Sequence, residues 1–446
     1  MPRASQTSRI PRAKDQIVHR NITHIKPSKE NPRTHSASQI HIIADSIQTF
    51  GFIVPILIDE NGFIIAGHGR LAAAKLLGLK QVPTICVSDL TDSQKRAYII
   101  ADNRIAELAG WDMELLGAEL EHLDDLELDF DLTVTGFDMA EIDMLVSPIS
   151  GQASDQTLEE QVPPVEKTII SRPGDLWILG RHRLYVGDAT QFSAYQKLMD
   201  GSLAKIVFTD PPYNVPIKGN VSGLGSKIHG EFMMASGEMS QDEFTTFLES
   251  VFYELVGWST KGSIHYICMD WRHMQELMDA AHDIYSEVKN VCVWNKTNGG
   301  MGSFYRSKHE FVFVLKNGAK PHINNFKLGQ KGRYRTNVWD YAGASSFGES
   351  RTEDLEMHPT VKPVQMICDA LLDCSNRGDI VLDPFGGSGS TLIAAERVGR
   401  NARLMELDPK YADVIIRRWE AYTGDTATEE HTKESFRDRA EVCHDQ

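Results

Sequence analysis

The strongest constraint on the fold comes from one segment near the C-terminus, where an apolar run leads into a glycine-rich turn and then into a helix. Residues 380–383 predict a buried strand, residues 384–389 contain three glycines, and residues 390–397 predict a helix. Glycine lets the backbone turn tightly and approach a ligand closely, as it does in the cofactor loops of Rossmann-type sheets. The segment therefore predicts an α/β fold in which a cofactor binds at the end of a parallel strand.

Two other loops of this general kind do not fit the residues. The phosphate-binding loop requires a lysine directly before Ser or Thr, where this chain has Gly389. The nucleophile elbow of hydrolases requires glycine two residues before and two residues after the serine, but Ser390 stands two residues after Ser388. The next predicted strand, 402–406, ends in Glu406, and a carboxylate about 20 residues after the first glycine is where such folds bind ribose hydroxyls.

A second motif follows the apolar run 204–208 and reads Asp210-Pro211-Pro212-Tyr213. The carboxylate and the carbonyl of Pro211, a residue without an N–H, are hydrogen-bond acceptors. Two acceptors can hold the exocyclic amine of a nucleobase and free its lone pair for attack, while the tyrosine ring offers a face on which the base stacks. An ordinary strand-to-turn exit is the alternative, because Asp and Pro are common turn residues.

Together, the two motifs resemble those of the beta-class DNA amino-methyltransferases, whose signatures are Asp-Pro-Pro-Tyr and Asp-Pro-Phe-x-Gly-x-Gly. The catalytic motif precedes the cofactor loop, so the resemblance implies a circularly permuted, Rossmann-like methyltransferase sheet. It also implies S-adenosylmethionine as the cofactor, no metal, and a catalytic set of Asp210, Pro211, Pro212 and Tyr213. The implied cofactor-binding residues are Asp188, Lys362, Asp383, Phe385, Gly386, Gly387, Gly389, Thr391, Glu406 and Asp408.

Lys362 and Asp188 join this set through two further elements. Lys362 belongs to the segment 358–363, which resembles the family's segment that closes the cofactor pocket. Asp188 belongs to the segment 184–189, which resembles its Gly-Asp element near the adenine of the cofactor. A loop before a helix start and a plain turn are the respective alternatives.

The resemblance also indicates the reaction. The target base must leave the duplex, which costs a few kcal/mol of unpairing and unstacking, and stacking on Tyr213 would return about 1–3 kcal/mol. Asp rather than Ser at the first motif position favours adenine N6, so we expect a site-specific DNA adenine-N6 methyltransferase of the restriction-modification type. Two alternatives stay open: an N4-cytosine DNA methyltransferase, and a ParB-like DNA-binding regulator whose methyltransferase half is inactive.

The first part of the chain has its own motifs. Residues 25–104 carry an Asn-Pro-Arg element at 31–33 and a Gly-x-x-Arg helix start, and both resemble the N-terminal domain of ParB-type partition proteins. The resemblance implies a small α+β domain, related to sulfiredoxin, with an anion or nucleotide site at Gly67, His68 and Arg70. The sequence departs from the fuller motif at Gly69, and it lacks the sulfiredoxin cysteine. A turn and helix start that serve only packing are the alternative.

Charge is distributed unevenly along this chain of net charge −16. From Lys289 to Arg335, ten Lys and Arg residues accompany a single acid, Glu310. From Asp112 to Glu160, fifteen Asp and Glu residues occur without Lys or Arg. The basic stretch has interleaved aromatic residues and favours DNA contact, with a solvated basic face as the alternative. We expect target recognition in 317–350 and DNA contacts from Lys327, Lys331, Arg333 and Arg335.

These observations predict a division into domains. We expect a ParB-like domain with a helical acidic extension at 17–146, a linker at 147–167, the methyltransferase domain at 168–424 and a polar tail at 425–446. Six cysteines without metal-ligand spacing, and the lack of a signal peptide or membrane-length apolar run, predict a soluble, cytoplasmic, DNA-associated protein of bacterial or phage origin. Double-stranded DNA is the expected partner, with a nucleotide at the N-terminal domain and a homodimer as further expectations and no membrane.

Overall fold

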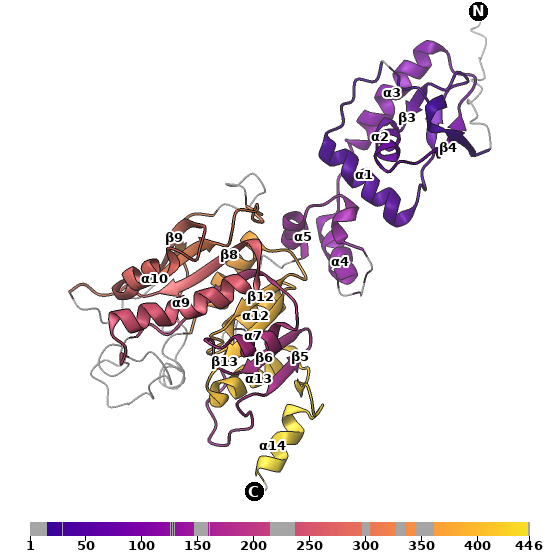
Figure 1. Cartoon of the computed structure of the whole chain (residues 1–446). Helices are drawn as coiled ribbons and strands as arrows, with labels where there is room; N and C mark the ends of the chain where they lie inside the picture. Colours follow the sequence, from indigo (N-terminus) through magenta and orange to yellow (C-terminus); the bar gives the residue numbers. More distant parts are fainter. Residues whose placement is uncertain are drawn as a thin grey trace, which may run out of the picture. The chain divides into compact units, whose positions relative to one another are not determined.

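The computed structural model describes residues 16–28, 30–124, 126, 128, 130–146, 159, 161–214, 237–296, 304–326, 335–343 and 361–444. The chain separates into two compact units, residues 1–146 and residues 147–446 (Figure 1). Within the described residues, no helix is both long enough and apolar enough to cross a membrane.

The N-terminal unit is built on a four-stranded sheet with the order β1-β4-β2-β3. Its elements are β1 (Val18–Asn21), η1 (Ile22–His24), α1 (Ala37–Phe50), β2 (Ile56–Ile58), β3 (Ile64–Ala66), α2 (His68–Leu76), β4 (Gln81–Cys86) and α3 (Asp92–Ala106). The side chain of Ser36 caps α1, and a capping box of Thr91 and Gln94 starts α3. The apolar core consists of Ile25, Ile56, Ile58, Ile64, Leu71, Ala74 and Val82. This is the small α+β domain that the sequence predicts.

A helical extension follows within the same unit. It contains α4 (Met113–Asp124), η2 (Leu132–Thr135) and α5 (Met139–Val146). Leu120, Leu132, Ile142 and Val146 form a small core of their own. Glu119, Glu121 and Glu141 lie on its exposed side, so the acidic stretch is carried by packed helices whose apolar side chains face inward.

The C-terminal unit is a ten-stranded sheet with the order β11-β9-β10-β8-β7-β12-β13-β6-β5-β14. Its strands are β5 (Leu176–Leu179), β6 (His182–Val186), β7 (Ala204–Thr209), β8 (Ser259–Met269), β9 (Glu287–Asn295), β10 (His309–Lys316), β11 (Val338–Asp340), β12 (Ile380–Asp383), β13 (Asn401–Glu406) and β14 (Thr428–Glu429). Strands β8, β7, β12, β13 and β6 pair in parallel, and β10 runs antiparallel between β8 and β9. The strand before the catalytic motif therefore lies beside the strand before the cofactor loop, as the permuted Rossmann-like order predicts.

Side chains of the strands alternate between the two faces of this sheet. In β7, Ile206 and Phe208 pack on one face and Val207 packs on the other; Ala204 joins Val207 because the register shifts between Ala204 and Ile206. The first face is covered by α11 (Val364–Cys374), α12 (Ser390–Arg397) and α13 (Pro409–Thr423), and the second by α7 (Phe192–Met199), α9 (Gln241–Gly257) and α10 (Met274–Ala281) (Figure 1). Each fully buried side chain of the size of Phe208 contributes about 1.5–3 kcal/mol to stability.

The carboxyl ends of the parallel strands meet at one edge of the sheet, and acidic residues stand there. Asp210 directly follows β7, Asp383 ends β12, and Glu406 ends β13. Because β10 runs antiparallel to β8, its first residues lie at this edge too, which adds Glu310. Open α/β sheets bind their ligands outside the carboxyl ends of the strands, so this edge is where we place the site.

Residues 425–446 were predicted to be a polar tail, and the described part of this segment corrects that prediction. Strand β14 pairs antiparallel with β5, and α14 (Phe436–His444) follows it. The buried ring of Phe436 meets Trp177 with centroids 5.4 Å apart, and Arg439 donates to Asp175 at 2.6 Å. The segment is polar on average, but Ala427 and Phe436 are buried, and average composition does not reveal this.

Part of the predicted target-recognition region also belongs to the domain core. The amides of Asn317 and Asn325 are buried and donate to main-chain carbonyls of neighbouring segments. Strand β11 pairs in parallel with β9 and carries the buried Trp339. Residues 327–334 and 344–350 lie outside the described residues.

Candidate active site

The glycine-rich loop connects β12 to α12 in a conformation that requires its glycines. Gly387 and Gly389 have φ angles of 52° and 84°, in the left-handed region. At Gly386, an added Cβ would lie 2.9 Å from Cδ1 of Ile415 on α13. Two of the glycines are therefore favoured by backbone conformation, and at the third a side chain would crowd Ile415 and the carbonyl of Met405.

Two carboxylates hold this loop, the buried Asp383 and the partly buried Glu406. Asp383 accepts hydrogen bonds from the Thr209 hydroxyl at 2.8 Å and from the N–H of Phe385 at 3.1 Å. Glu406 accepts from the N–H of Gly387 at 2.8 Å. Burial outweighs these hydrogen bonds and raises the pKa of Asp383 and that of Glu406 to about 7. Two carboxylates, at the ends of β12 and β13, thus flank the loop, and the protein compensates their negative charge only in part.

The catalytic motif stands beside this loop. Oδ1 of Asp210 accepts a hydrogen bond from the Tyr213 hydroxyl at 2.6 Å, and Oδ2 accepts one from the Lys362 ammonium at 2.5 Å. Burial raises the pKa of Asp210 above its ordinary value, because it outweighs the opposing charge of Lys362. Through the Thr209–Asp383 hydrogen bond, the strand that leads into the motif is joined directly to the cofactor loop.

Lys362 lies between the motif carboxylate Asp210 and the carboxylate of Glu310, and its part in cofactor binding stays a prediction. Its side chain is only 5% exposed, and its ammonium lies 2.5 Å from Asp210 and 3.2 Å from Oε2 of Glu310. It also stands over the ring of Tyr213, 5.4 Å from the centroid. Burial opposes the charge, but the two carboxylates outweigh burial and hold the pKa of Lys362 above its ordinary value. A motif predicts the residue type, whereas the packing around it decides where the ammonium points.

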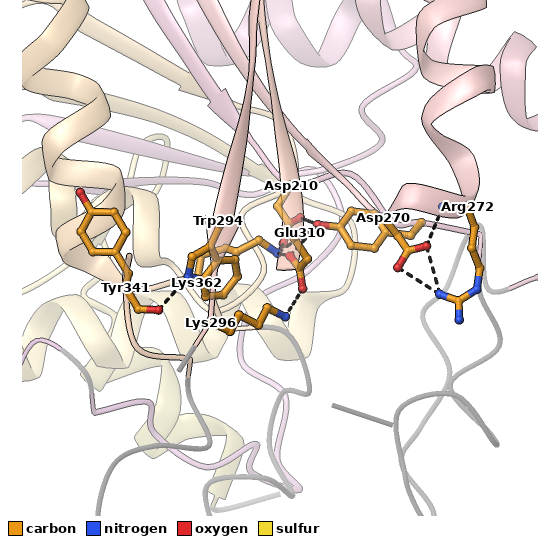
Figure 2. A network of polar contacts seen from close by, with 9 residues as sticks. Asp210, Asp270, Arg272, Trp294, Lys296, Glu310, Tyr341 and Lys362 are labelled. Carbon is orange, nitrogen blue, oxygen red and sulfur yellow. Dashed lines mark hydrogen bonds and ion pairs between the residues drawn. The ribbon is translucent and has the colours of Figure 1, made fainter. Parts of the chain in front are cut away.

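Glu310 is a residue of this cluster that the sequence reasoning did not identify (Figure 2). It is the second residue of β10; its Oε1 pairs with the Lys296 ammonium, and its Oε2 faces Lys362. Burial alone would raise the pKa of Glu310, but the two lysines lower it to about 2. A signal was present in the sequence, because Glu310 is the single acid among ten basic residues between Lys289 and Arg335.

Aromatic and apolar groups surround these charges. The Trp294 ring lies 4.6 Å from Nζ of Lys296 and 5.9 Å from Nζ of Lys362, and its indole N–H donates to the carbonyl of Tyr341 at 3.0 Å (Figure 2). The buried thiol of Cys268 in β8 is close enough to Asp210 for the carboxylate to raise its pKa further, after burial itself. Charges interact more strongly in such surroundings than in water.

The remaining predicted cofactor residues have local structural partners. Oδ1 of Asp188 accepts from the N–H and the hydroxyl of Thr190, both at 2.8 Å, in a turn after β6. Asp408 caps α13 by accepting from the N–H of Lys410 at 2.9 Å. Thr391 hydrogen-bonds Asp383, and the Phe385 ring packs on Phe247 of α9. All four predicted residues stand near the carboxyl edge, where their contacts shape the loops.

Arg335 is the one predicted DNA contact that the structure describes; Lys327, Lys331 and Arg333 lie outside the described residues. Its Nε donates to Asp373 at 2.8 Å, its Nη1 donates to the Tyr341 hydroxyl at 3.0 Å, and its guanidinium lies over the Trp339 ring. Asp373 is buried on α11. Arg335 therefore joins the β11 segment to α11 inside the domain, a role that a count of charges does not show.

An exposed aromatic pair precedes β10 at the same edge. Phe304 and Tyr305 are 87% and 81% exposed, and their rings meet edge to face with centroids 4.7 Å apart. Arg306 and Lys308 follow them, and Glu310 comes two residues later. Basic and aromatic side chains thus lie just outside the charged cluster.

The predicted anion site of the N-terminal unit has a different construction. Gly67 has a φ of 104° and stands directly before α2. The guanidinium of Arg70 donates to the carbonyls of residues 54–55 at 2.7 and 2.8 Å, and Nε2 of His68 accepts from the N–H of Ser28 at 3.2 Å. These contacts join three segments around the start of α2. Among the described residues, no cluster of three His, Cys, Asp or Glu side chains could hold a metal ion in either unit.

Comparison with known protein families agrees with this architecture. Residues 204–417 match the family of N6/N4 DNA methylases, and residues 6–104 match the ParB N-terminal domain. Residues 204–417 therefore form a domain of the N6/N4 DNA methylase family, and the chain carries a ParB-like N-terminal domain. Both resemblances are confirmed. Residues 114–173 match the helix-turn-helix domain of ParB-methyltransferases, an assignment the sequence reasoning did not make for the acidic extension and the predicted linker.

Individual relatives match one unit or the other. The ParB-like nuclease domain-containing protein YnaK of Escherichia coli is 49% identical over 80 residues, which are 18% of this chain and 92% of YnaK. The type II methyltransferase M.HinfI of Haemophilus influenzae is 28% identical over 233 residues, covering 48% of this chain and 62% of M.HinfI. The solved structure of M1.HpyAVI with SAM is 20% identical, with a TM-score of 0.39 over 53% of this chain and 97% of that one.

Proposed function

We propose that this protein transfers a methyl group from S-adenosylmethionine to the exocyclic N6 amine of adenine at a specific sequence in duplex DNA. The hydrogen bond from Thr209 to Asp383 carries the proposal. This bond joins Thr209, the residue before Asp210, to Asp383, the acid that precedes the glycine-rich loop. The carboxylate that would hold the amine and the loop that would hold the methyl donor therefore lie at the same edge of the sheet. Holding two reactants in this way supplies most of the rate gain in a displacement reaction.

The loop fits a cofactor that is cationic and carries hydroxyl groups. Asp383 and Glu406 have pKa values of about 7 because they are buried, and a positive ligand would stabilise their charged forms. Glu406 ends the strand after the loop, where folds of this class bind ribose. When bound, the cofactor supplies a methyl group that its positively charged sulfur activates. The residues that would hold it are Asp383, Phe385, Gly386, Gly387, Gly389, Thr391 and Glu406.

The catalytic motif would act on the target amine. The Asp210 carboxylate and the Pro211 carbonyl would accept its N–H groups, and the ring of Tyr213 would stack on the base. Both oxygens of Asp210 already accept hydrogen bonds from Tyr213 and Lys362, so the amine must share or replace one of them. The raised pKa of Asp210 suits this carboxylate to take the proton that the amine loses when the new N–C bond forms.

The charged surroundings support DNA as the substrate. The exposed aromatic pair Phe304–Tyr305 and the following Arg306 and Lys308 directly precede the strand that carries Glu310, and such residues contact bases and phosphates. The aspartate at position 210 favours adenine N6. Cytosine N4 is the alternative, since it presents the same kind of amine to the same groups.

The test is methyl transfer from labelled S-adenosylmethionine to mixed-sequence duplex DNA, followed by nucleoside digestion and mass analysis. We expect label in N6-methyladenosine; label in N4-methylcytosine would move the target base and keep the chemistry. Asp210→Asn should slow a single turnover by about 10²–10⁴-fold with cofactor affinity retained. Asp279→Asn, at a surface position of α10, is the matched control. No label from a protein that binds the cofactor would favour the ParB-like regulator.

A further inference from the structure

The site contains one lysine shared by two carboxylates, and the second carboxylate has a lysine of its own (Figure 2). Lys362 lies 2.5 Å from Oδ2 of Asp210 and 3.2 Å from Oε2 of Glu310. Lys296 pairs with the other oxygen of Glu310. The order along this chain of contacts is Asp210, Lys362, Glu310, Lys296, so negative and positive charges alternate from the catalytic motif outward.

Strand geometry brings the two carboxylates together. In β7, Ile206 and Phe208 face the same side of the sheet, and the period of two continues to Asp210. In β10, Val312 and Val314 face that same side, and the period continues back to Glu310. Strand β8 separates β7 from β10. The small side chain of Cys268 faces this side from β8, and it leaves room for the ammonium of Lys362 to meet both acids.

We propose that Glu310 is a positioning residue for methyl transfer. It shares the Lys362 ammonium with Asp210, so the ammonium binds Asp210 less tightly. Asp210 can then accept first the N–H groups and afterwards the proton of the target amine. This inference rests on the proposed function. If Glu310 carried no charge, Lys362 would pair with Asp210 alone, and the carboxylate would be both occupied and less basic.

The charge balance of the reaction explains why a second acid is needed. The amine nitrogen forms a bond to the methyl carbon while the bond from that carbon to sulfur breaks, and the electron pair of the broken bond stays on sulfur. The surplus proton of the nitrogen goes to Asp210. The four-residue cluster then changes from two negative and two positive groups to one negative and two positive groups. Without Glu310, the protonated state would hold two cations and no anion, which is costly in a buried site.

Other titratable groups face the cluster from each neighbouring element. They are Tyr213 after β7, Cys268 on β8, Asp383 on β12, and the pair of Asp270 and Arg272 after β8. Burial holds the pKa of Tyr213 and that of Cys268 well above their ordinary values, so both stay neutral. Asp270 has Arg272 as its counter-ion at 3.1 Å. Burial raises the pKa of Asp383 to about 7, and saturating cofactor, which is cationic, favours its ionised form during the measurement.

Two substitutions with opposite expected signs test the proposal. Single-turnover methyl transfer is measured from pH 5 to 9, with saturating S-adenosylmethionine and DNA. In Glu310→Gln, Lys362 pairs with Asp210 alone and makes this carboxylate a weaker base. The rate should therefore fall about 10–100-fold, and the acidic limb of the pH–rate profile should move about one unit to lower pH. Lys296→Met leaves Glu310 with less compensation, so the acidic limb should move to higher pH.

Glu287→Gln is the control, because Glu287 pairs with Lys289 and Lys316 at the opposite end of β9; its profile should match the wild type. A wild type without methyl transfer would contradict the proposed function itself. A wild type that transfers methyl, with both variants keeping its acidic limb or shifting it in the same direction, would overturn the role of Glu310. If Glu310→Gln shows no cooperative thermal melt, the direction of the shift in Lys296→Met decides alone.

Discussion

Each unit of this chain contains a cation that a sequence motif assigned to a ligand, and the two cations differ in what they meet. Lys362 of the methyltransferase unit lies between two carboxylates, whereas Arg70 of the ParB-like unit donates to two backbone carbonyls. Carboxylates cancel the charge of a cation, but carbonyl dipoles do not. The difference teaches that Lys362 belongs to a charge-balanced cluster around Asp210, while Arg70 fixes a turn near the start of α2 and has Asp102 as the acid whose charge acts on it. An anion or nucleotide there stays a prediction.

The largest effect that this comparison predicts is that of Lys362→Met. The substitution leaves Asp210 and Glu310 as two neighbouring acids without their shared cation, and breaking a buried pair in this way costs about 3–5 kcal/mol. We expect a large loss in the free energy of unfolding of the C-terminal unit, together with loss of methyl transfer. Chemical denaturation followed by tryptophan fluorescence measures the first. A variant as stable as the wild type would show that the charges are not coupled in this way.

Arg335→Gln sharpens the comparison, since this cation has a carboxylate partner but lies away from the catalytic motif. It leaves the buried Asp373 without its guanidinium, so the unfolding free energy should fall by about 3 kcal/mol. The slope of DNA affinity against salt concentration should stay unchanged, because the side chain is engaged inside the domain. If the slope of log DNA affinity against log salt concentration fell by about one in magnitude, Arg335 would instead be a phosphate contact.

Arg70→Gln should have a smaller effect, confined to the N-terminal unit. Two backbone carbonyls lose a charged donor, and because the carbonyl of Val54 is exposed to water the total cost should be about 1–2 kcal/mol. Methyl transfer to short DNA should be unchanged. Arg33→Gln, whose guanidinium is more exposed and pairs with Glu107, is a control for general loss of charge. If Arg70→Gln keeps full stability but abolishes binding of a nucleotide or inorganic phosphate, the side chain acts on a ligand and not as a clamp.

The smallest effect is a pH dependence of cofactor affinity. Asp383 and Glu406 have pKa values of about 7, so both are partly protonated at neutral pH, whereas Glu310, with a pKa of about 2, stays ionised. A cationic cofactor favours ionised acids, so its affinity should weaken as pH falls below 7, by at most about tenfold per pH unit for each acid. Titration calorimetry in two buffers should detect proton release on binding near pH 7.

The same two groups predict the opposite trend for stability without cofactor. Their folded-state pKa values lie above those of the unfolded chain, so they stabilise the folded state when they are protonated. This contribution is lost as pH rises from about 4 through 7, and Tm should therefore be higher at pH 6 than at pH 8. Saturating cofactor should reduce the difference. If the Tm difference between pH 6 and pH 8 were the same with and without cofactor, groups other than Asp383 and Glu406 would be responsible for it.

The sequence by itself determined the features that depend only on residues close together in the chain. The apolar run, the glycines and the helix start at 380–397 form a local pattern, and so does the motif at 210–213. A strand followed by an acid places that acid at the carboxyl edge wherever the strand lies in a parallel sheet. For this reason the sequence could predict Asp210, Asp383 and Glu406 at one edge. The family matches confirm the methylase and ParB-like assignments.

Tertiary structure alone decided which distant groups meet. Glu310 joins the catalytic motif because β10 runs antiparallel between β8 and β9, and a sequence pattern does not state which strands are neighbours. Lys362, Arg335 and Arg70 turn toward partners that lie 152, 38 and 16 positions away in the chain. Phe436 is buried because β14 adds to the edge of the sheet beside Trp177. Charge and periodicity are local properties, whereas the partner of a charge is set by packing of the whole domain.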